Sequence, residues 1–113
     1  MNIPQRFNKM LHIEPYKNIL AFKKNKKWEW VNRMTLKNNI LYCVDRLKDL
    51  KIKKHDRVVY KGRNSVEWIS WNIATNSIGA VWVPLYHNQN TDYVDYVIDD
   101  CLPKVFINED FHE

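Results

Sequence analysis

The chain has 113 residues, 45% of them hydrophobic and 27% charged, and its 13% aromatic content excludes a disordered tail. Its two glycines are too few for a glycine-rich phosphate loop, which excludes kinases, P-loop proteins and dinucleotide-binding folds. The formal net charge is +5, no apolar run reaches the roughly 20 residues of a membrane span, and the polar start lacks a signal peptide, so we expect an intracellular, cytoplasmic protein.

The first part of the chain predicts a short helix, a hairpin and a long helix. Residues 1–16 form the N-terminal helix, and residues 18–32 form a β-hairpin with a lysine-rich tip. Asn32 is a suitable N-cap for the helix that follows. One apolar stripe of this helix is expected to face the core: Leu36, Ile40, Cys43, Val44, Leu47 and Leu50.

From Arg57 onward, strands and helices alternate. The expected elements are a strand at Arg57–Tyr60, a helix at Val66–Ile78 capped by Asn64 or Ser65, a strand at Ala80–Val83 that is buried on both faces and stopped by Pro84, a helix capped by Thr91, and a strand at Val105–Ile107. Residues 33–113 are therefore a helix followed by a βαβαβ unit, which predicts an α/β fold with a parallel sheet and right-handed crossovers.

Two of these helices are expected to present particular residues to the sheet. On the first, Ser70 and Ser77 are small residues placed for contact with the sheet. On the second, the inward-facing residues are expected to be Tyr93, Val94, Val97, Ile98 and Cys101.

The side chains that could carry chemistry do not form a recognisable site. The histidines lack metal-ligand spacing, the serines lack a nucleophile elbow, and the adjacent acids Asp99 and Asp100 point in different directions on a helix. Cys43 and Cys101 are interpreted as buried core residues, and the five tryptophans as core or domain-interface residues rather than a base-stacking platform. We therefore assign no catalytic, ATP-binding or metal residue, and substrate-binding residues stay unassigned.

Charge is divided unevenly along the chain. Residues 17–63 hold fifteen Lys and Arg against four acids, whereas residues 64–113 hold one Lys against eight acids. A basic half is compatible with nucleic acid or an anionic membrane surface as a partner. A solvated surface is the favoured interpretation, because the lysines are spread over a hairpin tip and several helix faces.

Several segments resemble motifs of one family. Leu47–Val58 resembles the run A-x-x-L-x-x-L-G-V-x-x-G-D-R-V, Asn64–Ile69 resembles N-S-x-E-W, and Ile78–Tyr86 resembles x-G-A-V-x-V-P-L-Y of the AMP-forming adenylating enzymes, the acyl-CoA synthetase superfamily. The Pro84-Leu85-Tyr86 step is similar to that of long-chain fatty acyl-CoA synthetases. The resemblance implies that residues 1–113 are the N-terminal part of an AMP-binding domain, an incomplete part of a larger adenylate-forming fold.

The chain departs from the family pattern at two turn positions. Lys51 and His55 stand where the family usually has glycine. Each is therefore expected either to adopt a positive φ, at a cost of about 1 kcal/mol, or to remodel its turn.

The resemblance also implies a function for the complete enzyme. Such an enzyme couples ATP to a carboxylic acid, forms an acyl-adenylate and passes the acyl group to coenzyme A, with Mg²⁺ as a cofactor. Its Ser/Thr/Gly-rich ATP loop has no counterpart in this chain, so we expect this segment to bind no cofactor and to be inactive alone.

Two kinds of partner follow as expectations. The first is the remainder of a synthetase chain, or a second copy of this chain, at an exposed sheet edge. In the alternative function, the chain is a non-catalytic interaction module that binds a partner chain or an anionic surface.

Overall fold

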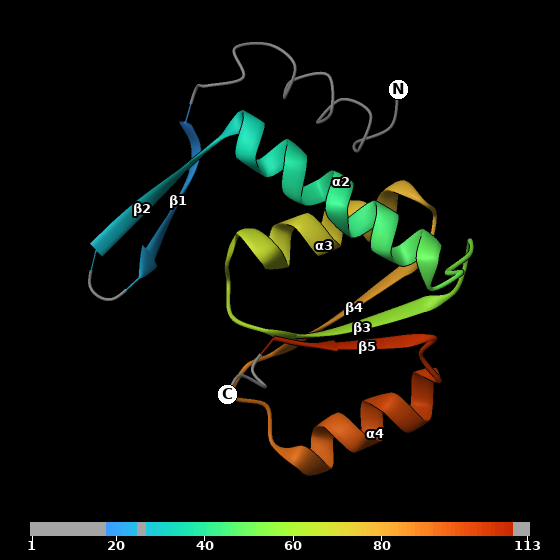
Figure 1. Ribbon diagram of the computed structural model, residues 1–113. Helices are drawn as coiled ribbons and strands as arrows, with labels where there is room; N and C mark the ends of the chain where they lie inside the picture. The colour runs from blue at the N-terminus through green and yellow to red at the C-terminus, as the bar shows by residue number, and fades with distance from the viewer. Residues whose placement is uncertain (1–17, 25–26, 110–113) are drawn as a thin grey trace.

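Two small sheets and three helices make up residues 18–24 and 27–109, the part of the chain described by the computed structural model (Figure 1). The helix expected in residues 1–16 lies outside these described residues. The first sheet is the predicted hairpin, in which β1 (Asn18–Lys24) pairs antiparallel with β2 (Lys27–Asn32). Both tryptophans of β2 are exposed, Trp28 by 66% and Trp30 by 65%, so they are not core residues, and a place at a domain interface stays a prediction for these two.

The long helix α2 (Arg33–Asp49) begins at the predicted cap. The Asn32 side-chain oxygen accepts a hydrogen bond from the Thr35 N–H at 2.8 Å, which satisfies one of the free donors of the first turn. Leu36, Cys43 and Leu47 are buried, as the apolar stripe predicted. Leu50 is not part of that stripe: it is the C-cap residue and is 44% exposed, because the helix ends before its side chain can turn inward.

The second sheet is parallel and has three strands in the order β4-β3-β5. The central strand β3 (Arg57–Gly62) pairs with β4 (Val81–Tyr86) on one side and with β5 (Val105–Asn108) on the other. Figure 1 shows α2 and α3 on one face of this sheet and α4 on the opposite face. The predicted βαβαβ unit is therefore confirmed.

Strand β4 differs from its prediction at both ends. It is an edge strand, with Val81 42% exposed and Trp82 and Val83 half-buried, so it is not buried on both faces. Nor does Pro84 stop it, since the strand pairs with β3 as far as Tyr86. The Val81 N–H donates to the Asp56 carbonyl at 2.7 Å and so points toward β3. Because successive backbone amides of a strand point to opposite sides, the Pro84 nitrogen, three residues later, faces the open edge. A missing N–H at that edge removes no hydrogen bond from the sheet.

Helix α3 (Val66–Ser77) is capped by Ser65, whose hydroxyl oxygen accepts the Trp68 N–H at 3.1 Å. Ser70 is fully buried as expected, but Ser77 is exposed and donates its hydroxyl to the Ala74 carbonyl. Thr75 is fully buried in its place. The sequence pattern predicted a helix that covers the sheet alone, whereas α3 lies alongside α2 as well (Figure 1), and this turns a different set of residues inward.

Helix α4 (Thr91–Cys101) starts one residue earlier than predicted. Its N-cap is Asn90, whose side-chain oxygen accepts the Tyr93 N–H at 2.8 Å, and Thr91 is the first helical residue. Val94 is buried and Val97, Ile98 and Cys101 are half-buried, whereas Tyr93 is 47% exposed and does not face inward. Tyr93 directly precedes Val94 and is turned about 100° from it around the helix, so it falls at the side of the apolar stripe.

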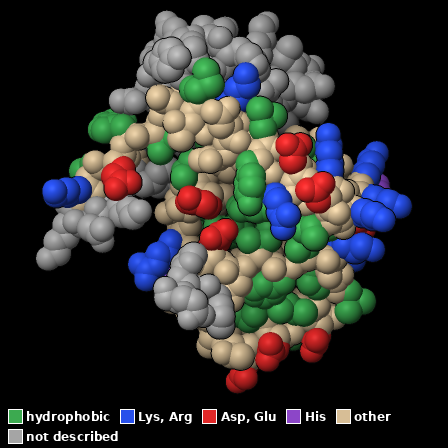
Figure 2. All heavy atoms as spheres, in the orientation of Figure 1, with side chains coloured by type: hydrophobic (Ala, Val, Ile, Leu, Met, Phe, Trp, Pro, Cys, Tyr) green, Lys and Arg blue, Asp and Glu red, His purple; other side chains and the backbone are tan. Residues whose placement is uncertain are grey.

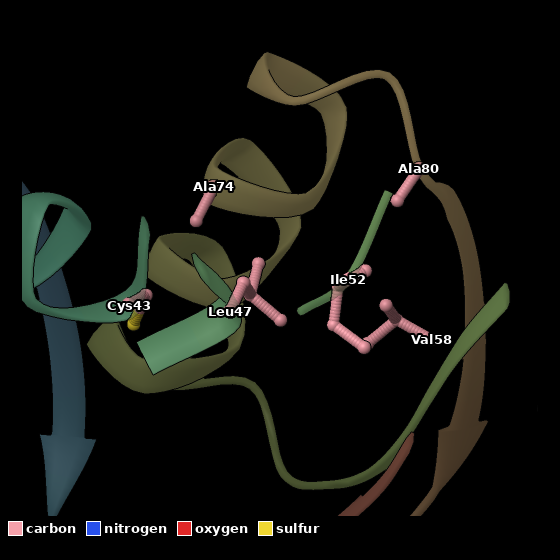
Figure 3. Packing of buried hydrophobic residues seen from close by; sticks show 6 residues of the cluster. All are labelled: Cys43, Leu47, Ile52, Val58, Ala74 and Ala80. Carbon is pink, nitrogen blue, oxygen red and sulfur yellow. The ribbon is translucent and has the colours of Figure 1, made fainter. Parts of the chain in front are cut away.

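The sheet separates two groups of buried residues. On the face of α2 and α3, Leu47 lies beneath Ala74 and points toward Ile52, which extends toward Val58 of β3 (Figure 3). On the face of α4, Val59 packs with Leu85 and Val94. Alternate residues of β3 thus serve the two faces, as strand geometry requires.

The turn from α2 to β3 contains both departures from the family's glycines. Lys51 has φ of 60° and His55 has φ of 73°, so both residues adopt the left-handed conformation that favours glycine. The first of the two expected outcomes, a positive φ without glycine, is therefore confirmed. In the described part of the chain, no helix is long and apolar enough to cross a membrane.

Candidate functional site at the carboxyl edge of the sheet

The carboxyl ends of the parallel strands define the candidate site, which we call the carboxyl edge. The chain leaves β3 toward α3 on one face of the sheet and leaves β4 toward α4 on the other (Figure 1). In open α/β sheets, a crevice opens where neighbouring strands send their loops to opposite faces, and ligands bind there. The polar residues at this place are Arg63, Asn64, His87, Asn88, Asn108 and Glu109.

A lysine joins the end of β3 to the loop after β4. The Lys61 ammonium donates a hydrogen bond to the His87 carbonyl oxygen at 2.8 Å, across the ends of β3 and β4. The position of the loop after β4 is therefore linked to the central strand. Lys61 and Arg63 bring positive charge to this edge, and Glu67, Asp92 and Glu109 bring negative charge, the first two of them in the first turns of α3 and α4.

Gly62 lets the Tyr60 ring and the Glu109 side chain come close to the backbone at the end of β3. A Cβ atom on Gly62 would lie 2.9 Å from a ring carbon of Tyr60 and 3.1 Å from the Cβ of Glu109. The Glu109 N–H also donates to the Lys61 carbonyl at 2.9 Å. Gly62 therefore serves close packing at this edge.

An aromatic cluster lies beside the carboxyl edge, on the face of the sheet covered by α3. Tyr60 stacks on Trp82 with ring centroids 5.3 Å apart, and Trp68 meets Trp82 edge-on at 5.5 Å. Both distances are typical of stabilising aromatic pairs. These two tryptophans are half-buried and pack within the domain, as the sequence analysis interpreted them.

The cysteines do not form a nucleophilic site. Cys43 is buried, and burial, followed by the charges of Glu109 and Glu67, raises the pKa of its thiol to about 12. The thiol therefore stays neutral at physiological pH, and the thiolate is the reactive form. Cys101 is half-buried rather than buried, and it packs against the group formed by Val59, Leu85 and Val94.

The histidines are not brought together. His87 is exposed at the carboxyl edge and His55 is exposed at the opposite end of the sheet, while His12 and His112 lie outside the described residues. Asp99 and Asp100 are both exposed on α4. No group of three or more His, Cys, Asp or Glu side chains in residues 18–24 and 27–109 is arranged to hold a metal ion.

The residues that the structure describes, 18–24 and 27–109, do not fit a bound triphosphate. Of the two glycines in the chain, Gly62 faces Tyr60 and Glu109, and Gly79 lies in a turn against the side chain of Lys54. Neither belongs to a loop whose backbone N–H groups surround an anion. No step on ATP or its magnesium can be assigned to these side chains.

A family model described as AMP-binding enzyme matches residues 12–113. The chain therefore belongs to the AMP-binding enzyme family. No curated protein sequence matches it.

Solved structures agree with this fold. The chain is similar to IdnL1 with a TM-score of 0.85 and 19% identity, covering 98% of this chain and 23% of that one. It is similar to the N-terminal subdomain of NpsA from Klebsiella oxytoca with a TM-score of 0.81 and 22% identity, covering 98% and 28%. It is also similar to the N-terminal domain of FACL13 from Mycobacterium tuberculosis with a TM-score of 0.82 and 25% identity, covering 95% and 26%.

The chain thus spans about a quarter of the solved chains it matches and has the fold of the N-terminal subdomains of adenylate-forming enzymes. Sequence reasoning did not find the carboxyl edge as a site. The signal that could have found it was the polar run after each apolar strand, 63–65 after the first and 87–90 after the second.

Proposed function

We propose that this chain is the N-terminal part of an ATP-dependent, AMP-forming acyl-CoA ligase-like protein that activates long-chain fatty acids when complete. The observation that carries the proposal is the family match over residues 12–113. The chain spans about a quarter of the length of the solved structures it matches, which supports its being a part of a larger enzyme. The fatty acid is supported by the Pro84-Leu85-Tyr86 step, which is similar to that of long-chain synthetases.

The role of this segment in the complete enzyme is structural. Its parallel sheet supplies strands against which the later parts of the enzyme build the nucleotide and acyl sites. ATP, Mg²⁺ and coenzyme A are the cofactors of that enzyme, and this segment alone does not adenylate a substrate. A cytoplasmic location stays a prediction of the sequence.

The remainder of the synthetase is expected to pack on the open edge of β5. In the described residues this strand pairs only with β3, and its half-buried Phe106 and Ile107 belong to opposite faces of the sheet. An edge strand with apolar side chains on both faces favours extension of the sheet by a further strand.

An exchange assay tests the proposal. Pyrophosphate exchange into ATP is measured for the 113-residue chain and for a chimera in which it replaces the matching quarter of a long-chain fatty acyl-CoA synthetase. We expect no exchange from the chain alone and fatty-acid-dependent exchange from the chimera. Exchange by the isolated chain contradicts the structural role, and a soluble, folded chimera that accepts only short or aromatic acids contradicts the long-chain assignment.

A further inference from the structure

The end of the sheet opposite the carboxyl edge, which we call the amino edge, carries a cluster of basic side chains. Three turns meet there, and hydrogen bonds fix them to one another: the His55 N–H donates to the Gly79 carbonyl at 2.9 Å, and the Lys104 N–H donates to the Arg57 carbonyl at 2.8 Å. The exposed basic residues of these turns and of the end of α2 are Lys48, Lys51, Lys53, Lys54, Arg57 and Lys104. Figure 2 shows Lys and Arg side chains gathered on one side of the molecule, where Figure 1 places the end of α2.

Acidic side chains only partly offset this charge. Asp49 and Asp56 belong to the same turn region, and the Asp56 carboxylate accepts the Lys53 N–H at 2.7 Å. Asp99 and Asp100 are exposed in the last turn of α4, just before Leu102, and belong to the same edge. The six basic residues therefore outnumber these four acids at the amino edge.

Large apolar side chains are exposed among these lysines. Leu102 is 75% exposed two residues before Lys104, Leu50 is 44% exposed next to Lys51, and Val81 is 42% exposed where it pairs with Arg57. Leu102 also has a positive φ of 48°, a conformation that disfavours leucine. The backbone of Leu102 caps α4, its N–H donating to the Ile98 carbonyl at 2.9 Å, whereas its exposed side chain contributes little to the packing of the described residues.

We propose that the amino edge docks on an anionic membrane surface. Lysine and arginine side chains attract acidic lipid headgroups, and exposed leucines insert at the boundary between headgroups and acyl chains. Binding to such a surface grows with the apolar area that is buried and with the attraction to anionic lipids, and the amino edge offers both. Nucleic acid is the less suitable partner, because its phosphates offer nothing to exposed leucines and its bases stack on aromatic rings, which this set of residues lacks.

The proposal does not depend on the enzyme that the chain belongs to. The amino edge and the carboxyl edge lie at opposite ends of the strands, so docking at the amino edge leaves the carboxyl edge uncovered. The exposed tryptophans of β2 belong to the hairpin and take no part in the amino edge.

Vesicle co-sedimentation of the full chain tests the charge requirement. The probes are phosphatidylcholine vesicles with about 30% phosphatidylserine and vesicles without it, both in low salt. The phosphatidylserine gives the vesicle surface a negative potential. The variant Lys53→Glu/Lys54→Glu is compared with Lys27→Glu/Arg63→Glu, which changes net charge equally at exposed positions away from the amino edge. Since each basic residue near the surface contributes about 1 kcal/mol, we expect the first pair to weaken binding at least about 30-fold and the control pair only a few-fold.

A second pair of variants tests the leucine. Leu102→Asn removes the apolar side chain and suits the positive φ, so the fold is kept; Leu41→Asn is the control on an exposed position of α2. We expect Leu102→Asn to weaken binding about fivefold to tenfold and to make the remaining binding more sensitive to salt, as loss of an inserted side chain predicts.

The outcomes separate the alternatives. Loss of binding with the amino-edge variants, with the controls bound and all chains equally folded by circular dichroism, supports the proposal. Three results each overturn it. They are an equal loss of vesicle binding in the Lys53/Lys54 and the Lys27/Arg63 double variants, equal binding to neutral and anionic vesicles, and binding to duplex DNA without binding to vesicles. Failure of pyrophosphate exchange in the chimera leaves these results unaffected, so the two proposals fail separately.

Discussion

Lys61 and His87 are joined by a hydrogen bond of 2.8 Å from the lysine ammonium to the histidine carbonyl oxygen, between residues 26 positions apart. This contact links the central strand to the loop after β4. It therefore holds the start of that loop against the end of β3 at the carboxyl edge.

Removing the ammonium should destabilise the loop after β4. Lys61→Met keeps the aliphatic part of the side chain and loses the donor, so we expect the free energy of unfolding to fall by about 1 kcal/mol. Urea denaturation measures this loss. Lys27→Met, on an exposed residue of β2, is the control and should leave stability unchanged; an equal effect of both substitutions contradicts the role of the contact.

Glycine at the two left-handed positions should stabilise the chain. Lys51→Gly and His55→Gly relieve backbone strain at φ of 60° and 73° and each should raise the free energy of unfolding by about 0.5–1 kcal/mol, after the added entropy of the unfolded chain is subtracted. Lys53→Gly, in the same turn but without a positive φ, should lower it. Thermal denaturation distinguishes the two directions.

The core beneath α3 depends on Leu47. This side chain is fully buried between α2, α3 and the turn that leads to β3, so Leu47→Ala should lower the free energy of unfolding by about 3 kcal/mol through lost burial and a cavity. Leu41→Ala, on a residue of the same helix that is 49% exposed, should change stability by less than about 0.5 kcal/mol. Chemical denaturation of the two variants provides the comparison, and similar losses contradict this account of the core.

Pro84 should protect the free edge of β4. Pro84→Thr adds an outward N–H to a strand whose other side is already paired, so the stability of the monomer should change little while self-association increases. Light scattering during size-exclusion chromatography at rising concentration measures the association. A variant that stays monomeric at the highest concentration shows that the proline does not guard this edge.

Burial of Cys43 should make stability depend on pH in the alkaline range. The folded-state pKa of about 12 lies above the ordinary value of 9.0, so the folded chain holds the thiol proton more tightly than the unfolded chain. This contribution is complete below pH 9 and is lost as the pH rises toward 12. The free energy of unfolding should therefore fall more steeply between pH 9 and 12 for the natural chain than for Cys43→Ala; parallel curves contradict the shift.

Most of the architecture was predictable from local patterns. The caps at Asn32 and Ser65 were readable because an oxygen-bearing side chain preceded an apolar periodic run. The order of strands and helices followed from alternating apolar runs, and the positive φ of Lys51 and His55 followed from the family's glycines. These features depend on a few neighbouring residues, which the sequence displays directly.

The errors share a different cause. The prediction that Pro84 stops its strand was wrong because the proline nitrogen faces an open edge, and whether a strand lies at an edge is decided by the whole sheet. Ser77 and Thr75 exchanged roles because α3 packs against α2 as well as the sheet. The carboxyl edge was missed because it is formed by three loops far apart in sequence, and the contact of Lys61 with His87 leaves no periodic signal.

The central position of β3 also governs when the protein can fold during synthesis. On the ribosome, β3 emerges before either of its neighbours, and only α2 is already present to cover Val58. Val59, on the other face, stays uncovered until the residues of α4 have left the exit tunnel. One face of β3 therefore stays uncovered from the end of β3 at Gly62 to the end of α4 at Cys101, about forty residues of translation, an interval in which chaperones have reason to bind the nascent chain.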